Sequence, residues 1–159
     1  MGIFSFAKDI GDKIFNRDES ANKETEADIN SEPSAQSIAN ILLKRIQDQN
    51  VEIDNLKVKY NGNTDTAEII GVAATQADRE KAIIAVGNVQ NVAQVVDHIE
   101  VKVAEPESTM YTVKSGDTLL AIAKAHYGAA DYMKIFEANK PMLSDPNKIY
   151  PGQVLRIPS

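Results

Sequence analysis

The side chains most often used for chemistry are sparse in this sequence and poorly spaced. His98 and His126 lie far apart and show no metal-ligand spacing. The stretch NGNTD, residues 61–65, offers oxygen ligands but lacks the rest of a calcium loop, including its final glutamate. Ser115 has no base near it in the sequence, and the chain contains no cysteine. We therefore predict a protein that is no enzyme, with structural roles for these residues.

Backbone carbonyls are a second source of ligands, and the sequence indicates two places where they gather. The last four carbonyls of a helix have no intrahelical partner, and that end carries partial negative charge. A helix predicted to end at Gly87 is followed by a sharp turn in GNVQNV, and an opening helix has a possible break at Gly11. Carbonyl dipoles can replace the water shell of potassium. Two such breaks, brought together, could surround a cation.

The opening stretch MGIFSFAKDIGDKIF, residues 1–15, predicts an amphipathic helix that docks on the rest of the protein. Its apolar residues follow the spacing of one helix face: Ile3, Phe6, Ala7, Ile10 and Ile14. It lacks the continuous apolar core of an export signal, and Phe6 departs from the myristoylation pattern. Its charges are balanced, whereas membrane-surface helices usually carry a basic face.

The middle of the chain predicts one compact unit, residues 35–103, after a polar, acidic linker at 16–34. Ser34 can cap a helix over about 35–49, and NLKVKY and AEIIGVA predict two strands around the NGN turn. Thr75 with Asp78 resembles the start of a helix that runs to Gly87. The stretch VAQVVDHIEVKV predicts the last strand. The order is α-β-β-α-β, with the helices on one face of the sheet.

The C-terminal residues 110–159 predict a second unit, after a linker at 104–109. A strand in MYTVK precedes a helix that Asp117 caps and that stops at Gly128. Asp131 caps a second helix, and VLRIP forms a short strand, giving the order β-α-α-β. Six residues are predicted to form its core: Leu119, Ile122, Ala123, Ile135, Phe136 and Leu155. The fold class is therefore α+β with two small domains.

Composition narrows the possible partners. The chain has 159 residues, with 43% hydrophobic and 25% charged residues, which is ordinary for a globular protein. Its net charge of -6 argues against nucleic acid, because phosphate binding needs clustered lysine and arginine. No apolar run reaches the roughly 18 residues of a membrane span.

Three stretches of the last unit resemble a LysM domain: YTVKSGDTLLAIAKAHYG, FEANK and IYPGQVLRIP. The middle unit resembles a BON domain through its element order and the stretch AVGNVQNVAQVVDHI. Together with the opening stretch, the whole arrangement resembles the small cytoplasmic BON–LysM potassium-binding proteins of bacteria. The resemblance covers most of the chain outside the acidic linker.

This resemblance implies a potassium sensor or buffer in the cytoplasm that becomes ordered and compact when the ion binds. It also implies an ion site made of five backbone carbonyls: those of Ala7, Ile10, Gly87, Val89 and Val92. The LysM domain would then dock against the BON domain. The sequence does not separate potassium from rubidium, caesium or ammonium, because selectivity depends on the size and stiffness of the cage.

The LysM resemblance implies an alternative, which is binding of N-acetylglucosamine glycans such as peptidoglycan. The positions that match the glycan groove are Gly116, Asp117, Thr118, Leu119, Asn139, Lys140 and Pro141. A purely structural interpretation is that these residues shape a helix start and a loop. An envelope adaptor, with LysM on peptidoglycan and BON on lipid, would require a periplasmic location, whereas the sequence predicts no export.

Overall fold

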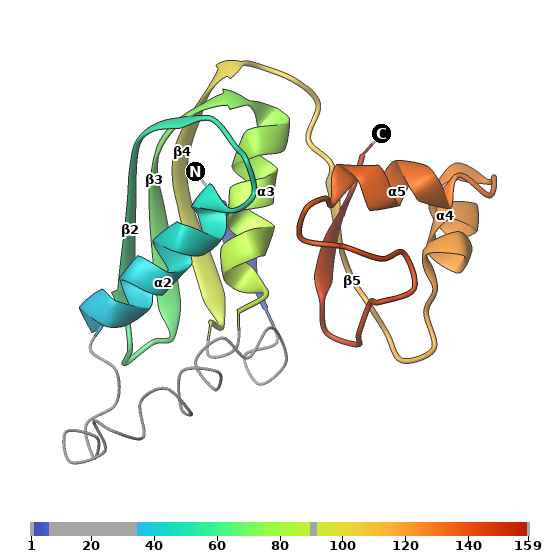
Figure 1. The fold of residues 1–159 in the computed structure, drawn as a ribbon, viewed down its shortest axis with the longest axis horizontal. Coiled ribbons are helices and arrows are strands. Elements are labelled where there is room, and N and C mark those ends of the chain that lie inside the picture. Colours follow the sequence, from blue (N-terminus) through green and yellow to red (C-terminus); the bar gives the residue numbers. More distant parts are fainter. Residues whose placement is uncertain (1, 7–34, 90–91, 159) are drawn as a thin grey trace.

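The structure is a computed structural model, and we describe residues 2–6, 35–89 and 92–158 (Figure 1). These residues contain a four-stranded sheet with two helices and a two-stranded sheet with two helices. Each sheet contributes to its own hydrophobic core. The predicted α+β class is therefore confirmed.

The central unit has the predicted α-β-β-α-β order. Its elements are α2 (Ala35–Gln47), β2 (Ile53–Asn61), β3 (Thr66–Thr75), α3 (Gln76–Gly87) and β4 (Gln94–Val103). Strands β2 and β3 form an antiparallel hairpin across the NGNTD turn, while β3 and β4 run parallel and are joined by α3. Both helices pack on the sheet and on each other, and they bury Leu42, Ile46, Ala82, Ile83 and Val86.

The first strand corrects the prediction for the start of the chain. Gly2–Ser5 form strand β1, not a helix, and this strand pairs antiparallel with β4 at the edge of the sheet. Phe4 packs against the core, whereas Ile3 is 67% exposed. In the stretch GIFSF, buried and exposed side chains therefore alternate as in a strand. The backbone groups of this strand bond to β4, a partner that the prediction of a helix from local spacing did not consider. The remainder of the predicted helix, residues 7–15, lies outside the described residues.

Local side-chain contacts fix the turns of the central unit. The hydroxyl of Thr75 accepts a hydrogen bond from the backbone N–H of Asp78 at 3.1 Å, which confirms the predicted start of α3. Within the hairpin, the N–H of Asn63 donates to Oδ1 of Asn61 at 2.9 Å. The NGNTD stretch is thus a hairpin, as predicted.

The C-terminal unit has the predicted β-α-α-β order. Its elements are β5 (Thr109–Thr112), α4 (Leu119–Tyr127), α5 (Tyr132–Ala138) and β6 (Val154–Ile157). Strands β5 and β6 form an antiparallel pair, and all six predicted core residues are buried. Gly128 adopts a left-handed conformation with φ 69° and ends α4, as predicted.

The caps of α4 and α5 differ from the prediction. Thr118, not Asp117, caps α4, and its hydroxyl accepts a hydrogen bond from the N–H of Ala121 at 3.1 Å. The Asp117 carboxylate instead accepts from the hydroxyl of Tyr111 at 2.6 Å. Asp131 occupies the cap position of α5 without a side-chain capping bond. The Asp117 contact crosses to β5, so local spacing did not reveal it.

Across the described part of the chain, no helix combines the length and the apolar character needed to cross a membrane.

Candidate functional site

The loop between α3 and β4, residues 88–93, contains two of the predicted carbonyl ligands, and a third, Gly87, precedes it directly. Val89 and Val92 are fully buried, and the N–H of Val92 donates to the carbonyl of Val89 at 3.2 Å. The N–H of Val89 in turn donates to the carbonyl of Val86 at 3.2 Å. Ala7 and Ile10, the other two predicted ligands, lie outside the described residues, as do residues 90–91. Gly87, Val89 and Val92 are thus all buried, with Gly87 at the end of α3 and Val92 bonded back to Val89.

Gly87 makes a close contact with the ring of Phe6, which would have to shift to admit any larger residue. A Cβ atom at this position would overlap Cζ, Cε1 and Cε2 of Phe6, so the ring lies directly on the glycine. Gly87 does not have a left-handed backbone, and the C-cap of α3 is Asn88. Space, rather than backbone conformation, therefore favours glycine here.

Phe6 also contacts the far end of the loop. Its backbone N–H donates to the carbonyl of Ala93 at 2.8 Å. The N–H of Ala93 in turn donates to the carbonyl of Asp65 at 2.8 Å, which ties the loop to the β2–β3 hairpin. The last described residue of the N-terminal segment therefore lies against both ends of the α3–β4 loop.

Asn88 joins this loop to the C-terminal unit. Its Nδ2 donates to the carbonyl of Val154 at 2.8 Å, and the N–H of Val154 donates to Oδ1 of Asn88 at 2.8 Å. This pair of bonds imitates one rung of a β-ladder, and Asn88 is buried. Nδ2 also lies 3.3 Å from the sulfur of Met142. The amide is thus fully engaged at the contact between the units.

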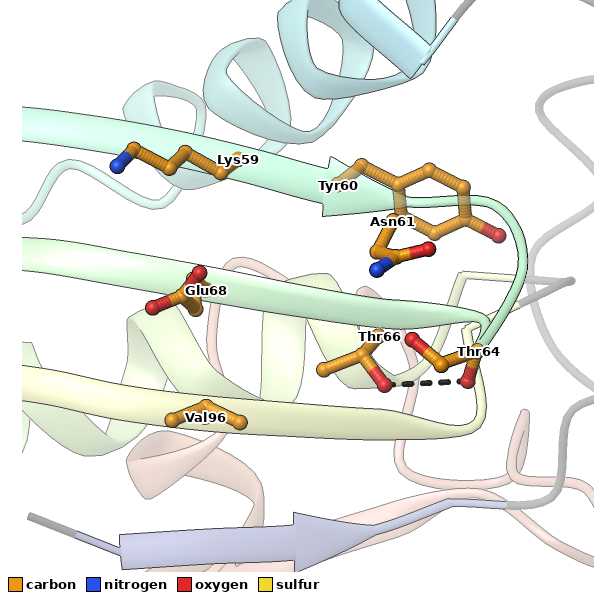
Figure 2. A pocket seen from close by; sticks show the side chains of 7 residues that line it. All are labelled: Lys59, Tyr60, Asn61, Thr64, Thr66, Glu68 and Val96. Atoms are coloured by element: carbon orange, nitrogen blue, oxygen red, sulfur yellow. Dashed lines mark hydrogen bonds between the residues drawn. The ribbon is translucent and has the colours of Figure 1, made fainter.

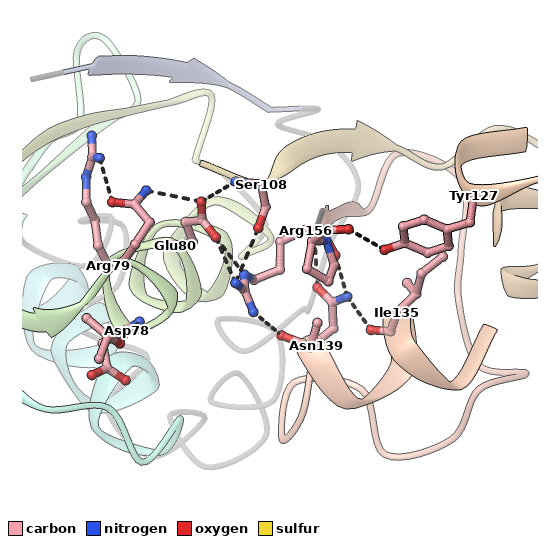
Figure 3. Close-up of polar contacts among 12 residues, drawn as sticks. Asp78, Arg79, Glu80, Ser108, Tyr127, Ile135, Asn139 and Arg156 are labelled. Atoms are coloured by element: carbon pink, nitrogen blue, oxygen red, sulfur yellow. Dashed lines mark hydrogen bonds and ion pairs between the residues drawn. The ribbon is translucent and has the colours of Figure 1, made fainter. Parts of the chain in front are cut away.

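A buried ion pair forms the second polar contact between the units (Figure 3). Arg156 of β6 reaches Oε1 of Glu80 on α3, with Nε at 2.9 Å and Nη2 at 2.8 Å. Oε2 of Glu80 accepts from the N–H of Ser108 at 2.7 Å and from Nε2 of Gln76 at 3.1 Å. Burial alone would raise the pKa of Glu80, but these hydrogen bonds hold the pKa below its ordinary value. Glu80 is therefore charged at neutral pH.

Asp97, in the middle of β4, is fully buried and paired with Arg79 of α3. Nε of Arg79 donates to Oδ2 of Asp97 at 2.7 Å, and Oδ1 accepts from the N–H of Ile99 at 2.8 Å. Burial would lower the pKa of Arg79, yet the contacts with Asp97 and Glu107 raise it. The carboxylate of Asp97 also accepts from the N–H of Ile99, which lies beyond the part of β4 that pairs with β1.

The predicted glycan residues divide into two groups. Gly116, Thr118, Lys140 and Pro141 are exposed, and they lie at the start of α4 and just after α5, two helices that pack together. The other three differ in burial: Leu119 and Asn139 are buried, and Asp117 is half-buried.

The buried amide of Asn139 holds the C-terminal unit together. Its Nδ2 donates to the carbonyls of Ile135 at 2.7 Å and Arg156 at 2.9 Å, and Oδ1 accepts from the N–H of Arg156 at 2.9 Å.

Leu119 is buried in the same unit. The hydrogen bond from Tyr111 lowers the pKa of Asp117, as does the N–H of Lys114. These three side chains therefore act within the unit.

Comparisons with known proteins cover the C-terminal unit and the full length of the chain. Residues 111–158 match the LysM domain family. The potassium binding protein Kbp of Escherichia coli O6:H1 is 40% identical over 159 residues, which span 99% of each chain. The chain belongs to the Kbp family. An uncharacterized protein of Deinococcus radiodurans is 51% identical over 51 residues, 31% of this chain and 19% of that protein.

In this member of the Kbp family, sequence reasoning missed the residues that connect the parts. Arg156 carried a usable signal, because a charged residue within the apolar stretch VLRIP must be paired when buried, whereas Glu80 lies in the charged stretch DREK and carried none. Phe6 was assigned to a helix face, and Asn88 carried no signal. Both act through contacts with residues far away in the sequence.

Other polar groups of the Kbp-family chain lie apart from these sites. His98, on β4, lies with Nε2 at 3.0 Å from Oε1 of Glu68, and His126 packs edge-to-face on Tyr111 with ring centroids 5.5 Å apart. Both histidines thus have protein contacts, in keeping with the structural roles predicted for them. Among the described residues, no group of three or more histidine, aspartate and glutamate side chains could hold a metal ion.

A shallow pocket lies beside the β2–β3 hairpin (Figure 2). It is lined by Lys59, Tyr60, Asn61, Thr64, Thr66, Glu68 and Val96. In it, the hydroxyl of Thr66 donates to the carbonyl of Thr64 at 3.1 Å. None of the ion or glycan residues predicted from the sequence is among these seven.

Proposed function

We propose that this protein binds potassium. The observation that carries the proposal is the similarity to the potassium binding protein Kbp over the full length of both chains. The geometry supports it, because the buried residues Val89 and Val92 follow the C-terminal end of α3, where backbone carbonyls and the helix dipole favour a cation.

The proposed ligands are the backbone carbonyls of Ala7, Ile10, Gly87, Val89 and Val92. Burial of Gly87, Val89 and Val92 supports their assignment, because carbonyl dipoles act more strongly where water is excluded. The close approach of Phe6 to Gly87 also supports it, since residue 7 follows Phe6 directly in the chain. Rubidium, caesium and ammonium are further candidate ions for the same cage.

We propose that the protein is a cytoplasmic sensor or buffer, with a binding rather than a catalytic role. Ion binding would order the loop within a BON domain at 35–103 and favour its contact with the LysM domain at 110–159. Asn88 supports this coupling, because it lies between two proposed ligands and bonds directly to Val154. An ion shifts such an equilibrium only if it binds the docked state more tightly.

Thermal melts of the ion-stripped protein test potassium binding directly. The protein is melted in choline chloride, and potassium, sodium, rubidium, caesium or ammonium replaces choline at constant ionic strength. Potassium at about 100 times its dissociation constant should stabilise the folded state by about 2.7 kcal/mol. Identical melting temperatures in all salts would contradict the proposal.

Glycan binding by the LysM domain is the second candidate function. It is favoured by the LysM match over residues 111–158 and by the exposure of Gly116, Thr118, Lys140 and Pro141. Sedimentation with purified peptidoglycan tests binding, and cell fractionation tests whether the protein shares a compartment with peptidoglycan. Absence from the pellet would contradict this function, while a periplasmic location would contradict the cytoplasmic role.

A further inference from the structure

Phe6 contacts both ends of the α3–β4 loop by two different kinds of interaction. Its ring lies on the backbone of Gly87, where a Cβ would force the ring to shift, and its N–H donates to the carbonyl of Ala93 at 2.8 Å. Between these contacts lie the buried residues Val89 and Val92. One residue of the N-terminal segment therefore fixes where the loop begins and where it ends.

Strand β1 determines where this ring lies. Ser5 is in register with Gln94, so the next residue along the strand meets Ala93. Because side chains alternate along a strand, Phe4 and Phe6 point to the same face of the sheet, and both pack against the core of the central unit. The ring is thus positioned by the pairing of β1 with β4, by the bond from Phe6 to Ala93 and by packing against the core.

We propose that Phe6 is a positioning residue for cation binding by the α3–β4 loop. Its ring lies against Gly87 and its N–H holds the carbonyl of Ala93, so it fixes the backbone on either side of Val89 and Val92 in the conformation that binds the ion. This inference rests on the proposed potassium function and adds a residue that contributes no ligand atom. A carbonyl cage needs such support, because small displacements of its oxygens change the fit to the ion.

The test compares potassium titrations of Phe6→Ala and of the wild type, both as full chains. Truncation should lower the fraction of molecules whose α3–β4 loop is in the conformation that binds potassium. If this fraction falls to one tenth, the apparent dissociation constant for potassium rises about tenfold. The titrations use isothermal calorimetry, and melts in choline, sodium and potassium chloride at equal ionic strength accompany them. A merely structural role would lower the melting temperature equally in all three salts, whereas a positioning role also reduces the potassium-specific increment.

Leu56→Ala is the matched control. Leu56 is half-buried against the same core but lies on β2, at the opposite edge of the sheet. This variant should lose stability in every salt and keep the wild-type dissociation constant. Phe6→Leu, a milder truncation, should fall between the wild type and Phe6→Ala and provides the readout if Phe6→Ala does not fold.

A double substitution tests the contact itself. Gly87→Ala places a methyl group in the volume of the ring and should weaken potassium binding in the wild-type background. After Phe6→Ala the same methyl group meets no ring, so Gly87→Ala should then have little further effect. Non-additivity of this kind identifies residues that act through one contact.

The outcomes separate the two proposals. If the wild type responds to potassium and the Phe6 variants retain its dissociation constant, the role of Phe6 is wrong and potassium binding stands. Fully additive effects of Phe6→Ala and Gly87→Ala would also overturn the role of Phe6. If the wild type shows no potassium response, the proposed function fails and this inference fails with it.

Discussion

Gly87 lies so close to the ring of Phe6 that a side chain at this position would overlap the ring. Valine there would place its Cβ inside the volume of the Phe6 ring and add two methyl groups beyond it. We expect Gly87→Val to cost about 1–3 kcal/mol through overpacking and to weaken potassium binding. His98→Ala, which removes a half-exposed strand side chain paired with Glu68, should leave binding unchanged. Equal potassium titrations of the wild type and Gly87→Val would contradict the site.

Asn88 carries a prediction about the contact between the two units. Asn88→Ala leaves the N–H and carbonyl of Val154 without these partners in a buried place, which should cost about 1–3 kcal/mol. The measurement is urea unfolding together with small-angle scattering of the folded protein. Asn147→Ala, at an exposed position, is the control and should change neither. Unchanged stability of Asn88→Ala would mean that this amide does not hold the units together.

At the scale of single elements, strand β1 is where the predicted and the observed structure differ most, because a helix was predicted there. A helix would place Ile3 on its buried face, whereas the strand leaves Ile3 exposed and turns Phe4 toward the core. We therefore expect Ile3→Lys to change the free energy of unfolding by less than about 0.5 kcal/mol. Phe4→Lys should cost considerably more, because it removes apolar packing. Equal losses in urea unfolding would favour the helix.

The same strand shows why part of the fold was predictable and part was not. Long periodic segments and strong local signals, such as the Thr75 cap and the left-handed Gly128, gave the correct order of helices and strands. The short stretch GIFSF fits both periods, and the deciding factor is the edge of β4, far away in the sequence. Asp117 was misassigned for a similar reason, because Tyr111 of β5 takes its carboxylate.

The candidate ion site was still less accessible to sequence reasoning. Its proposed ligands are backbone carbonyls, which every residue has, so no side-chain pattern marks them. Gly87 was visible as the end of a helix, but its contact with Phe6 depends on the pairing of β1 with β4. Resemblance to a family could therefore suggest ligands, whereas the packing around them required the structure.

At the scale of the whole molecule, the Glu80–Arg156 pair predicts how the protein responds to acid. The pKa of Glu80 is lower in the folded protein than its ordinary value of 4.5, so the unfolded chain binds more protons at mildly acidic pH. The stabilisation by this carboxylate is complete above about pH 4.5 and is lost as the pH falls through the folded pKa. The free energy of unfolding should therefore fall on acidification over this range.

Two variants isolate this contribution in urea unfolding at a series of pH values. Glu80→Gln should be less stable at neutral pH, because Arg156 remains buried without its charged partner, and its acid dependence should be shallower. Glu137→Gln changes an exposed carboxylate near Lys140 and should keep the wild-type slope. Parallel pH profiles for Glu80→Gln and the wild type would show that another group governs the acid response.

The pairing of β1 with β4 also dictates an order of events during synthesis. Gly2–Ser5 are made before their partners, Gln94–Asp97, which follow only after most of the central unit has been made. Closing such a long loop slows folding, because its entropy must be lost before the contact is gained. A nascent chain that stops before β4 has neither the strand that holds β1 nor the Ala93 carbonyl that receives Phe6. Translation must therefore pass residue 97 before the strand that positions Phe6 can be fully paired.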